Sequence, residues 1–272
     1  MPDVLRLVCT GDSFTEGMSD VLRPDGHHTG WADRVAVALA VHERRRSGRG
    51  VEYANLAVRG KLLDQVVAEQ LPAAMRFEPD VLTFHAGPND VLRRGTGLAD
   101  LAARYDAAVA DAAQAAGERV VLFTAIGRAG HPGRLADHLA DRFARFNDVV
   151  REVAARHGAT LVDMGRVPAL TDRRVWHVDR LHLAPEGHTR VAAMVLEALG
   201  VTDEDLLGGA SGWWREPLPV AAAVPRHAQL ASDVRWAREH LAPWVGRRLR
   251  GVSSGDDRDP KDPSPRPVDV PT

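Results

Sequence analysis

A serine and a histidine of this sequence have the surroundings that nucleophilic acyl transfer requires. Ser13 comes three residues after the apolar run 4–10, and Asp179 precedes His182 by three residues. A serine hydroxyl becomes a good nucleophile when a base takes its proton, and an imidazole can accept that proton because it titrates near neutral pH. Asp179 can hold the other ring proton and fix the tautomer of His182. The residues are therefore candidates for a triad of Ser13, His182 and Asp179, although a lone serine or Asp-x-x-His unit is more often structural.

Other histidines compete for the role of the base. His85 ends a predicted strand and is the best rival, but no orienting carboxylate stands close to it in the sequence. His188 falls one to two turns into a predicted helix and is expected to be structural. His27 and His28 lie in the loop 18–29, and we expect a solvated loop rather than the lining of a substrate cleft.

Four short blocks, taken in order, resemble those of the SGNH (GDSL) hydrolases, a family of serine esterases and lipases. The blocks are Gly11-Asp12-Ser13-Phe14-Thr15-Glu16-Gly17, Asn55-Leu56-Ala57-Val58-Arg59-Gly60, Gly87-Pro88-Asn89-Asp90 and Asp179-Arg180-Leu181-His182. Four blocks in the right order between residues 11 and 188 are far more specific than any one alone.

The resemblance implies which groups stabilise the negative charge that develops on the ester oxygen. These oxyanion donors are the backbone N–H groups of Ser13 and Gly60 and the side-chain amide of Asn89. Alone, Gly60 would be an ordinary turn glycine and Asn89 a turn or cap residue, so both roles rest on the joint pattern. We expect Asp12 and Asp90 to tie the loops together by hydrogen bonds.

By the same resemblance, the protein is expected to be a cofactor-free serine hydrolase that cleaves carboxylic esters through an acyl-enzyme on Ser13. A small or medium acyl ester is the favoured small-molecule substrate, because no separate carbohydrate-binding module is evident. Two alternatives stay open. The same site could transfer the acyl group to another acceptor, or deacylate sugars or thioesters. An inactive hydrolase scaffold could instead act as a binding module.

The pattern of elements predicts an α/β fold, because short β-branched runs alternate with longer stretches of helical period. Strands are expected at 4–10, 51–55, 81–85, 120–124 and 160–164. Parallel neighbours need crossover connections, so the helices should cover both faces of the sheet. We expect a three-layer α/β/α sandwich with a five-stranded parallel sheet, flavodoxin-like, over residues 1–200.

The loops that carry the candidate residues follow strands of this sheet. In parallel sheets, ligands bind beyond the carboxyl ends of the strands. The candidate residues are expected to meet at that edge, and they are Ser13, Gly60, Asn89, Asp179 and His182.

The C-terminal part of the chain differs in composition. Residues 201–250 hold four of the six tryptophans, and we expect a helical extension packed on the catalytic domain rather than a lid or a partner-binding face. Residues 251–272 have five prolines, five aspartates and almost no large apolar side chain, which predicts a disordered tail. The Gly-x-Ser-x-Gly match at 251–255 is treated as chance, since no strand precedes it and no histidine follows it.

Composition excludes several other classes of function. A formal net charge of −2 gives no reason to expect nucleic acid as a partner, and no apolar run is long enough for a membrane span. Cys9 is the only cysteine, so no intrachain disulfide or cysteine zinc site is possible. No nucleotide or metal motif is found. Asp3 and Arg6 argue against a signal peptide, so we expect a cytoplasmic monomer or weak homo-oligomer.

Overall fold

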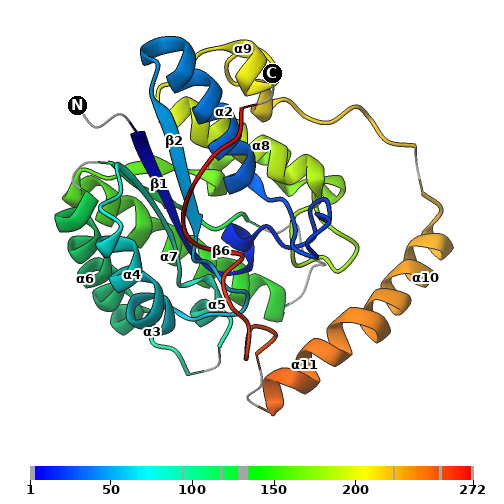
Figure 1. The fold of residues 1–272 in the computed structure, drawn as a ribbon. Coiled ribbons are helices and arrows are strands. Elements are labelled where there is room, and N and C mark those ends of the chain that lie inside the picture. The colour runs from blue at the N-terminus through cyan, green and yellow to red at the C-terminus, as the bar shows by residue number, and fades with distance from the viewer. Residues whose placement is uncertain are drawn as a thin grey trace.

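The computed structural model describes residues 4–93, 95–116, 119–127, 134–222, 224–250 and 253–270. The predicted α/β/α architecture is confirmed: five parallel strands form a sheet between two layers of helices (Figure 1). A sixth strand, which the sequence analysis missed, pairs antiparallel with β2 and gives the order β5-β4-β3-β1-β2-β6. The strands are β1 (Val4–Gly11), β2 (Gly50–Asn55), β3 (Val81–His85), β4 (Val120–Phe123), β5 (Thr160–Val162) and β6 (Asp262–Pro267).

Helices cover both faces of the sheet. The α-helices are α1 (Ser13–Glu16), α2 (Trp31–Ser47), α3 (Leu63–Gln65), α4 (Leu71–Arg76), α5 (Pro88–Val91), α6 (Leu98–Ala116), α7 (Arg134–His157), α8 (Pro185–Ala198), α9 (Glu204–Leu207), α10 (Arg226–Trp236) and α11 (Ala242–Leu249). Two π-helical turns, η1 (Val66–Gln70) and η7 (Ala237–Leu241), join α3 to α4 and α10 to α11. Short 3-10 turns are η3 (Met164–Arg166), η4 (Pro168–Thr171), η5 (Arg173–Val175) and η6 (Trp213–Arg215).

The central strand β1 shows how the sequence produces two cores. Successive side chains of a strand point to opposite faces of the sheet. Leu7 and Cys9 therefore pack in the core beneath α2 and α8, whereas Val8 packs in the core beneath α4, α6 and α7. Because helices cover both faces of the sheet, a ligand can reach it only at the ends of the strands.

The prediction of a disordered tail is wrong for residues 253–270, because β6 extends the sheet there. Three of the six residues of β6 are prolines, and an edge strand tolerates them because one of its sides has no partner strand. Pro267 lies opposite Glu52 and Arg266 opposite Tyr53, and a register irregularity separates these pairs from Asp262, which lies opposite Asn55. The low apolar content of the tail did not predict its order, because backbone pairing with β2 and one buried ion pair hold this segment in place.

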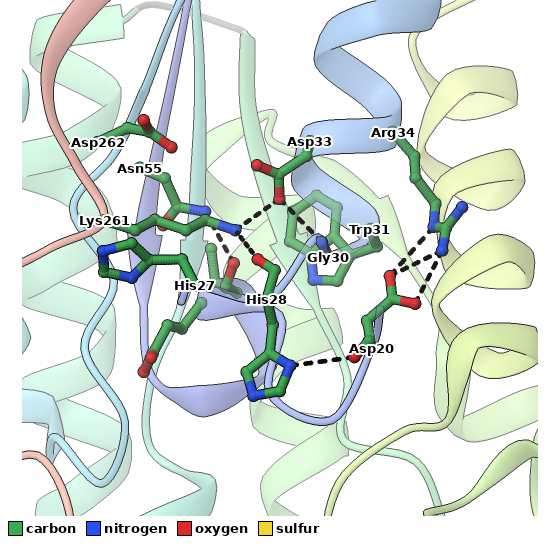
Figure 2. Close-up of polar contacts among 12 residues, drawn as sticks. Asp20, His27, His28, Gly30, Trp31, Asp33, Arg34, Asn55, Lys261 and Asp262 are labelled. Carbon is green, nitrogen blue, oxygen red and sulfur yellow. Dashed lines mark hydrogen bonds and ion pairs between the residues drawn. The ribbon is translucent and has the colours of Figure 1, made fainter. Parts of the chain in front are cut away.

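That ion pair joins Lys261, just before β6, to the start of α2. Lys261 Nζ lies 2.5 Å from Asp33 Oδ2 and donates to the carbonyl of His28 at 3.0 Å (Figure 2). Only 1% of the Lys261 side chain is exposed. Burial raises the pKa of the Asp33 carboxyl, and the Lys261 charge opposes that rise. We call this contact of Lys261 with Asp33 and His28 the clasp. The clasp neutralises the Asp33 carboxylate, which would otherwise be buried at a higher cost in free energy.

The tryptophan-rich extension divides into two unlike parts. Trp214 is buried, and its Nε1 donates to Glu197 of α8 at 2.9 Å. By contrast, α10 and η7 contain no buried residue, and the segment from α10 to α11 lies outside the three layers (Figure 1). No helix in the described ranges is long and apolar enough to cross a membrane.

Removal of the Lys261 charge should test the clasp, with the only other lysine as a matched control. Lys261→Met should lower the free energy of unfolding by about 3 kcal/mol, because Asp33 would stay buried without its main counter-charge. Lys61→Met should cost about 1 kcal/mol or less, since its partner Glu69 is half exposed. Urea unfolding measures both losses. Equal losses for the two variants would mean that the clasp does not hold the tail.

Candidate active site

A cavity of about 130 Å³ lies at the carboxyl edge of the sheet, where Ser13, Asn89 and His182 line it together. Most of its other walls are apolar, and they include Phe14, Leu92, Ile126, Phe143, Met164 and Trp176. Asp179 reaches the cavity only through His182, and Gly60 is absent from the lining. The structure therefore brings three of the five predicted residues to one cavity. Asp179 contacts His182, and Gly60 precedes Lys61, whose carbonyl accepts the Asn89 amide.

The loop 179–182 forms a carboxylate–imidazole pair. Asp179 Oδ2 lies 2.7 Å from His182 Nδ1, while Oδ1 accepts the backbone N–H groups of Leu181 and His182. Burial alone would raise the pKa of the Asp179 carboxyl, but the hydrogen bond and charge of His182 and the two N–H groups hold it well below its usual range. With Nδ1 engaged by a carboxylate, Nε2 of His182 is the ring atom left for proton transfer.

Ser13 begins α1 directly after β1. The Asp12 side chain caps this short helix by accepting the N–H of Phe14 at 3.0 Å. In the described part of the chain, no acceptor takes the backbone N–H of Ser13. Ser13 Oγ and His182 line the same cavity without a hydrogen bond between them, as is common before substrate tightens a catalytic geometry.

Gly60 sits in a backbone conformation that favours glycine, with a φ of +76°. A Cβ here would also collide with Ser253 Oγ of the C-terminal segment. Among the described residues, the Gly60 N–H also has no acceptor. Glu16 holds the preceding residue, because its carboxylate accepts the backbone N–H and the Nε–H of Arg59 at 2.6 and 2.8 Å. Two unpaired N–H donors therefore follow β1 and β2.

The amide of Asn89 is already hydrogen bonded within the site. Its Nδ2 donates to Asp12 Oδ2 and to the carbonyl of Lys61, both at 3.0 Å. The nitrogen carries two protons, so an oxyanion would have to share one of them. Asp90 Oδ2 accepts the N–H of Leu63 at 2.9 Å. The predicted loop-tying roles of Asp12 and Asp90 are confirmed.

His85 does have a carboxylate beside it, which corrects the sequence analysis. Its Nδ1 lies 3.3 Å from Asp12 Oδ1, its ring packs 4.5 Å from that of Phe14, and it lines the same cavity. The sequence concealed this contact because Asp12 and His85 are far apart along the chain. Asp12 is shared with two other donors and lies farther away than Asp179 lies from His182, so geometry favours His182 as the base.

His188 links α8 to the loop after Ser13, as expected for a structural residue. Its Nδ1 accepts the N–H of Trp31 at 3.3 Å, and its Nε2 donates to the carbonyl of Met18 at 3.1 Å. One acceptor and one donor describe a neutral imidazole. Burial lowers the pKa of His188 to about 4, which agrees with that form.

Two further observations bear on ligands. His28 contacts the carbonyl of Asp20, and neither His27 nor His28 lines the cavity. Within the ranges that the structure describes, no three His, Cys, Asp or Glu side chains are grouped to bind a metal ion.

The low pKa of His188 predicts a pH-dependent stability. The unfolded imidazole takes up its proton near pH 6.5, whereas the folded one does so at about 4. The free energy of unfolding should therefore fall as the pH drops from about 6.5 towards 4. His188→Gln keeps a donor and an acceptor but does not titrate, so its stability should change less over that range. Parallel stability curves for the two proteins would contradict this role.

Comparisons with known proteins identify the family. A sequence model of the GDSL-like lipase/acylhydrolase family matches residues 9–190, more than half of the chain. No curated protein gives a significant sequence match. Several solved structures share the fold.

An alpha/beta hydrolase from the metagenome of Lake Arreo, Spain, is 25% identical, with a TM-score of 0.58 over 72% of this chain and 95% of the other. The lipase/acylhydrolase of Enterococcus faecalis is 21% identical, with a TM-score of 0.56 over 72% and 95%. An acetylxylan esterase of Geobacillus stearothermophilus is 21% identical, with a TM-score of 0.57 over 72% and 94%. These likenesses show a shared fold, and the family match shows that the chain belongs to the GDSL-like lipase/acylhydrolase family and is a hydrolase that acts on esters.

Proposed function

We propose that this chain hydrolyses carboxylic esters of short acyl groups through an acyl-enzyme on Ser13. One observation carries the proposal: Ser13 and His182 line one cavity, and Asp179 Oδ2 lies 2.7 Å from Nδ1 of His182. A nucleophile, a base and an orienting carboxylate are the parts that acyl transfer by serine requires.

In the first half of the reaction, Ser13 Oγ attacks the ester carbonyl carbon while His182 Nε2 takes the hydroxyl proton. The negative charge that develops on the carbonyl oxygen is met by the backbone N–H groups of Ser13 and Gly60, which have no acceptor in the described part of the chain. The side-chain amide of Asn89 donates one of its two N–H groups to the same oxygen, sharing that proton with its present acceptor. Asp179 stabilises the imidazolium, which then protonates the departing alcohol.

In the second half, a water molecule attacks the acyl-enzyme. His182 removes a proton from this water, and the same donors hold the second oxyanion. Collapse of that intermediate releases the carboxylic acid and returns the proton to Ser13. No metal or organic cofactor enters the proposed steps.

The size and lining of the cavity support a short acyl group. A cavity of about 130 Å³ is small beside the roughly 300–1,000 Å³ of pockets that hold drug-sized ligands. Its apolar walls favour an unsubstituted acyl chain over a charged one. The acetylxylan esterase among the similar structures acts on an acetyl ester by its name, which agrees with a small acyl group.

The first test removes the nucleophile. Ser13→Ala should reduce kcat/KM for nitrophenyl acetate by on the order of 10⁴- to 10⁶-fold, because no acyl-enzyme can form. Ser253→Ala is the matched control: this serine fits the Gly-x-Ser-x-Gly pattern and adjoins Gly60, yet it should leave kcat/KM close to wild type. A folded Ser13→Ala protein with wild-type turnover would rule out the serine mechanism.

The second test decides between His182 and His85 as the base. The burst of nitrophenol that accompanies acylation reports this step separately from deacylation. We expect His182→Ala to lose the burst, Asp179→Asn to weaken it strongly because the amide favours the wrong tautomer, and His85→Ala to keep it. A burst that survives in His182→Ala and disappears in His85→Ala would transfer the role to the Asp12–His85 pair.

A further inference from the structure

The helical segment 226–249, formed by α10, η7 and α11, contributes little to the core. None of the residues of α10 and η7 is buried, and Leu230 and Val234 are more than half exposed. The segment lies outside the three layers (Figure 1) and beyond residue 190, where the family match ends. Burial of apolar surface therefore does not explain why the segment lies where it does.

The segment is attached to the loop that carries His182. Trp236 Nε1 donates to the backbone carbonyl of Asp179 at 2.8 Å, and the Arg180 guanidinium packs 4.7 Å from the centre of the Trp236 ring. Arg180 also pairs with Asp233 at 2.5 Å, with both side chains at least 80% buried. A shielded pair of this kind is stronger than an exposed one. We call these contacts of Asp233 and Trp236 the latch.

Beyond the latch, Trp244 of α11 lines the cavity that contains Ser13 and His182. In an unbroken α-helix, residues eight positions apart would lie about 80° apart around the axis. The π-helical turn η7 lies between Trp236 and Trp244 and unwinds the helix, since each of its turns takes up more residues. It therefore reduces the offset, so that both rings can face the catalytic domain.

We infer that Trp244 limits the size of the acyl group, and that the latch positions it by tying the segment to the catalytic loop. This inference rests on the proposed function, because it assigns a wall to the cavity in which Ser13 is acylated. Trp244 is the one lining residue contributed from beyond residue 200 among those described. A large, rigid indole at that place excludes longer chains and contacts short ones.

The test is the dependence of kcat/KM on acyl length, measured with nitrophenyl acetate, butyrate, octanoate and dodecanoate. Trp244→Ala should raise the octanoate-to-acetate ratio of kcat/KM by about tenfold or more, because the enlarged cavity admits added methylenes. Trp244→Ala should also lower kcat/KM for the acetate ester, because the short acyl group loses its contact with the indole. This decrease should come mainly from a higher KM, since Trp244 takes no part in proton transfer. Val245→Ala, on the same helix but outside the cavity lining, should keep the wild-type ratio.

The latch is tested through the same ratio. Trp236→Phe keeps an aromatic ring but loses the N–H, and Asp233→Asn removes the charge that pairs with Arg180. Each should shift the ratio in the direction of Trp244→Ala, and neither should shift it further once Trp244 is alanine. Circular dichroism and melting curves establish that each variant is folded.

Three failures give different results. If wild-type protein turns over none of the esters, or Ser13→Ala turns them over normally, the proposed function itself is wrong. If wild type and Ser13→Ala behave as proposed but folded Trp244→Ala has the wild-type length profile, Trp244 does not limit the acyl group. If only the latch variants keep the wild-type profile, the latch does not position Trp244.

Discussion

The arrangement of the site depends on one buried carboxylate, that of Asp12, at the point where β1 ends. It accepts the N–H of Phe14 and so caps the helix that begins at Ser13, and it accepts the amide of Asn89 from α5, which follows β3. It also lies 3.3 Å from Nδ1 of His85. A buried carboxylate is costly unless hydrogen bonds satisfy it, so these donors are held close to Asp12 and to one another.

Carboxylates fix the remaining loops in a similar way. Glu16 holds Arg59 and thereby the position of Gly60, whereas Asp90 accepts a backbone N–H from the segment that begins α3. The imidazole side of the site is anchored differently. The loop of Asp179 and His182 is braced by its own backbone N–H groups and by the segment 226–249. A rigid sheet edge therefore faces a loop supported by the C-terminal part of the chain, and the cavity lies between them.

Local patterns predicted much of this structure, and contacts between distant residues accounted for what was missed. The five parallel strands follow from β-branched runs, and the contact between Asp179 and His182 follows from their spacing within one loop. The Asp12–His85 pair joins the residue after β1 to the last residue of β3, so no local pattern reveals it. β6 escaped notice because prolines and aspartates are poor strand formers, yet an edge strand tolerates them where a partner strand and a buried ion pair exist. The place of Trp244 depends on a π-helical turn, which sequence periodicity does not indicate.

The central claim is that Ser13 is the acylated group and His182 its base. The most direct measurement is peptide mapping by mass spectrometry after reaction with a fluorophosphonate, which phosphonylates an activated serine. We predict a single adduct on the peptide that contains Ser13, formed far more slowly in His182→Ala. An adduct on another residue, or an equal rate of modification of Ser13 without the His182 imidazole, would contradict the assignment.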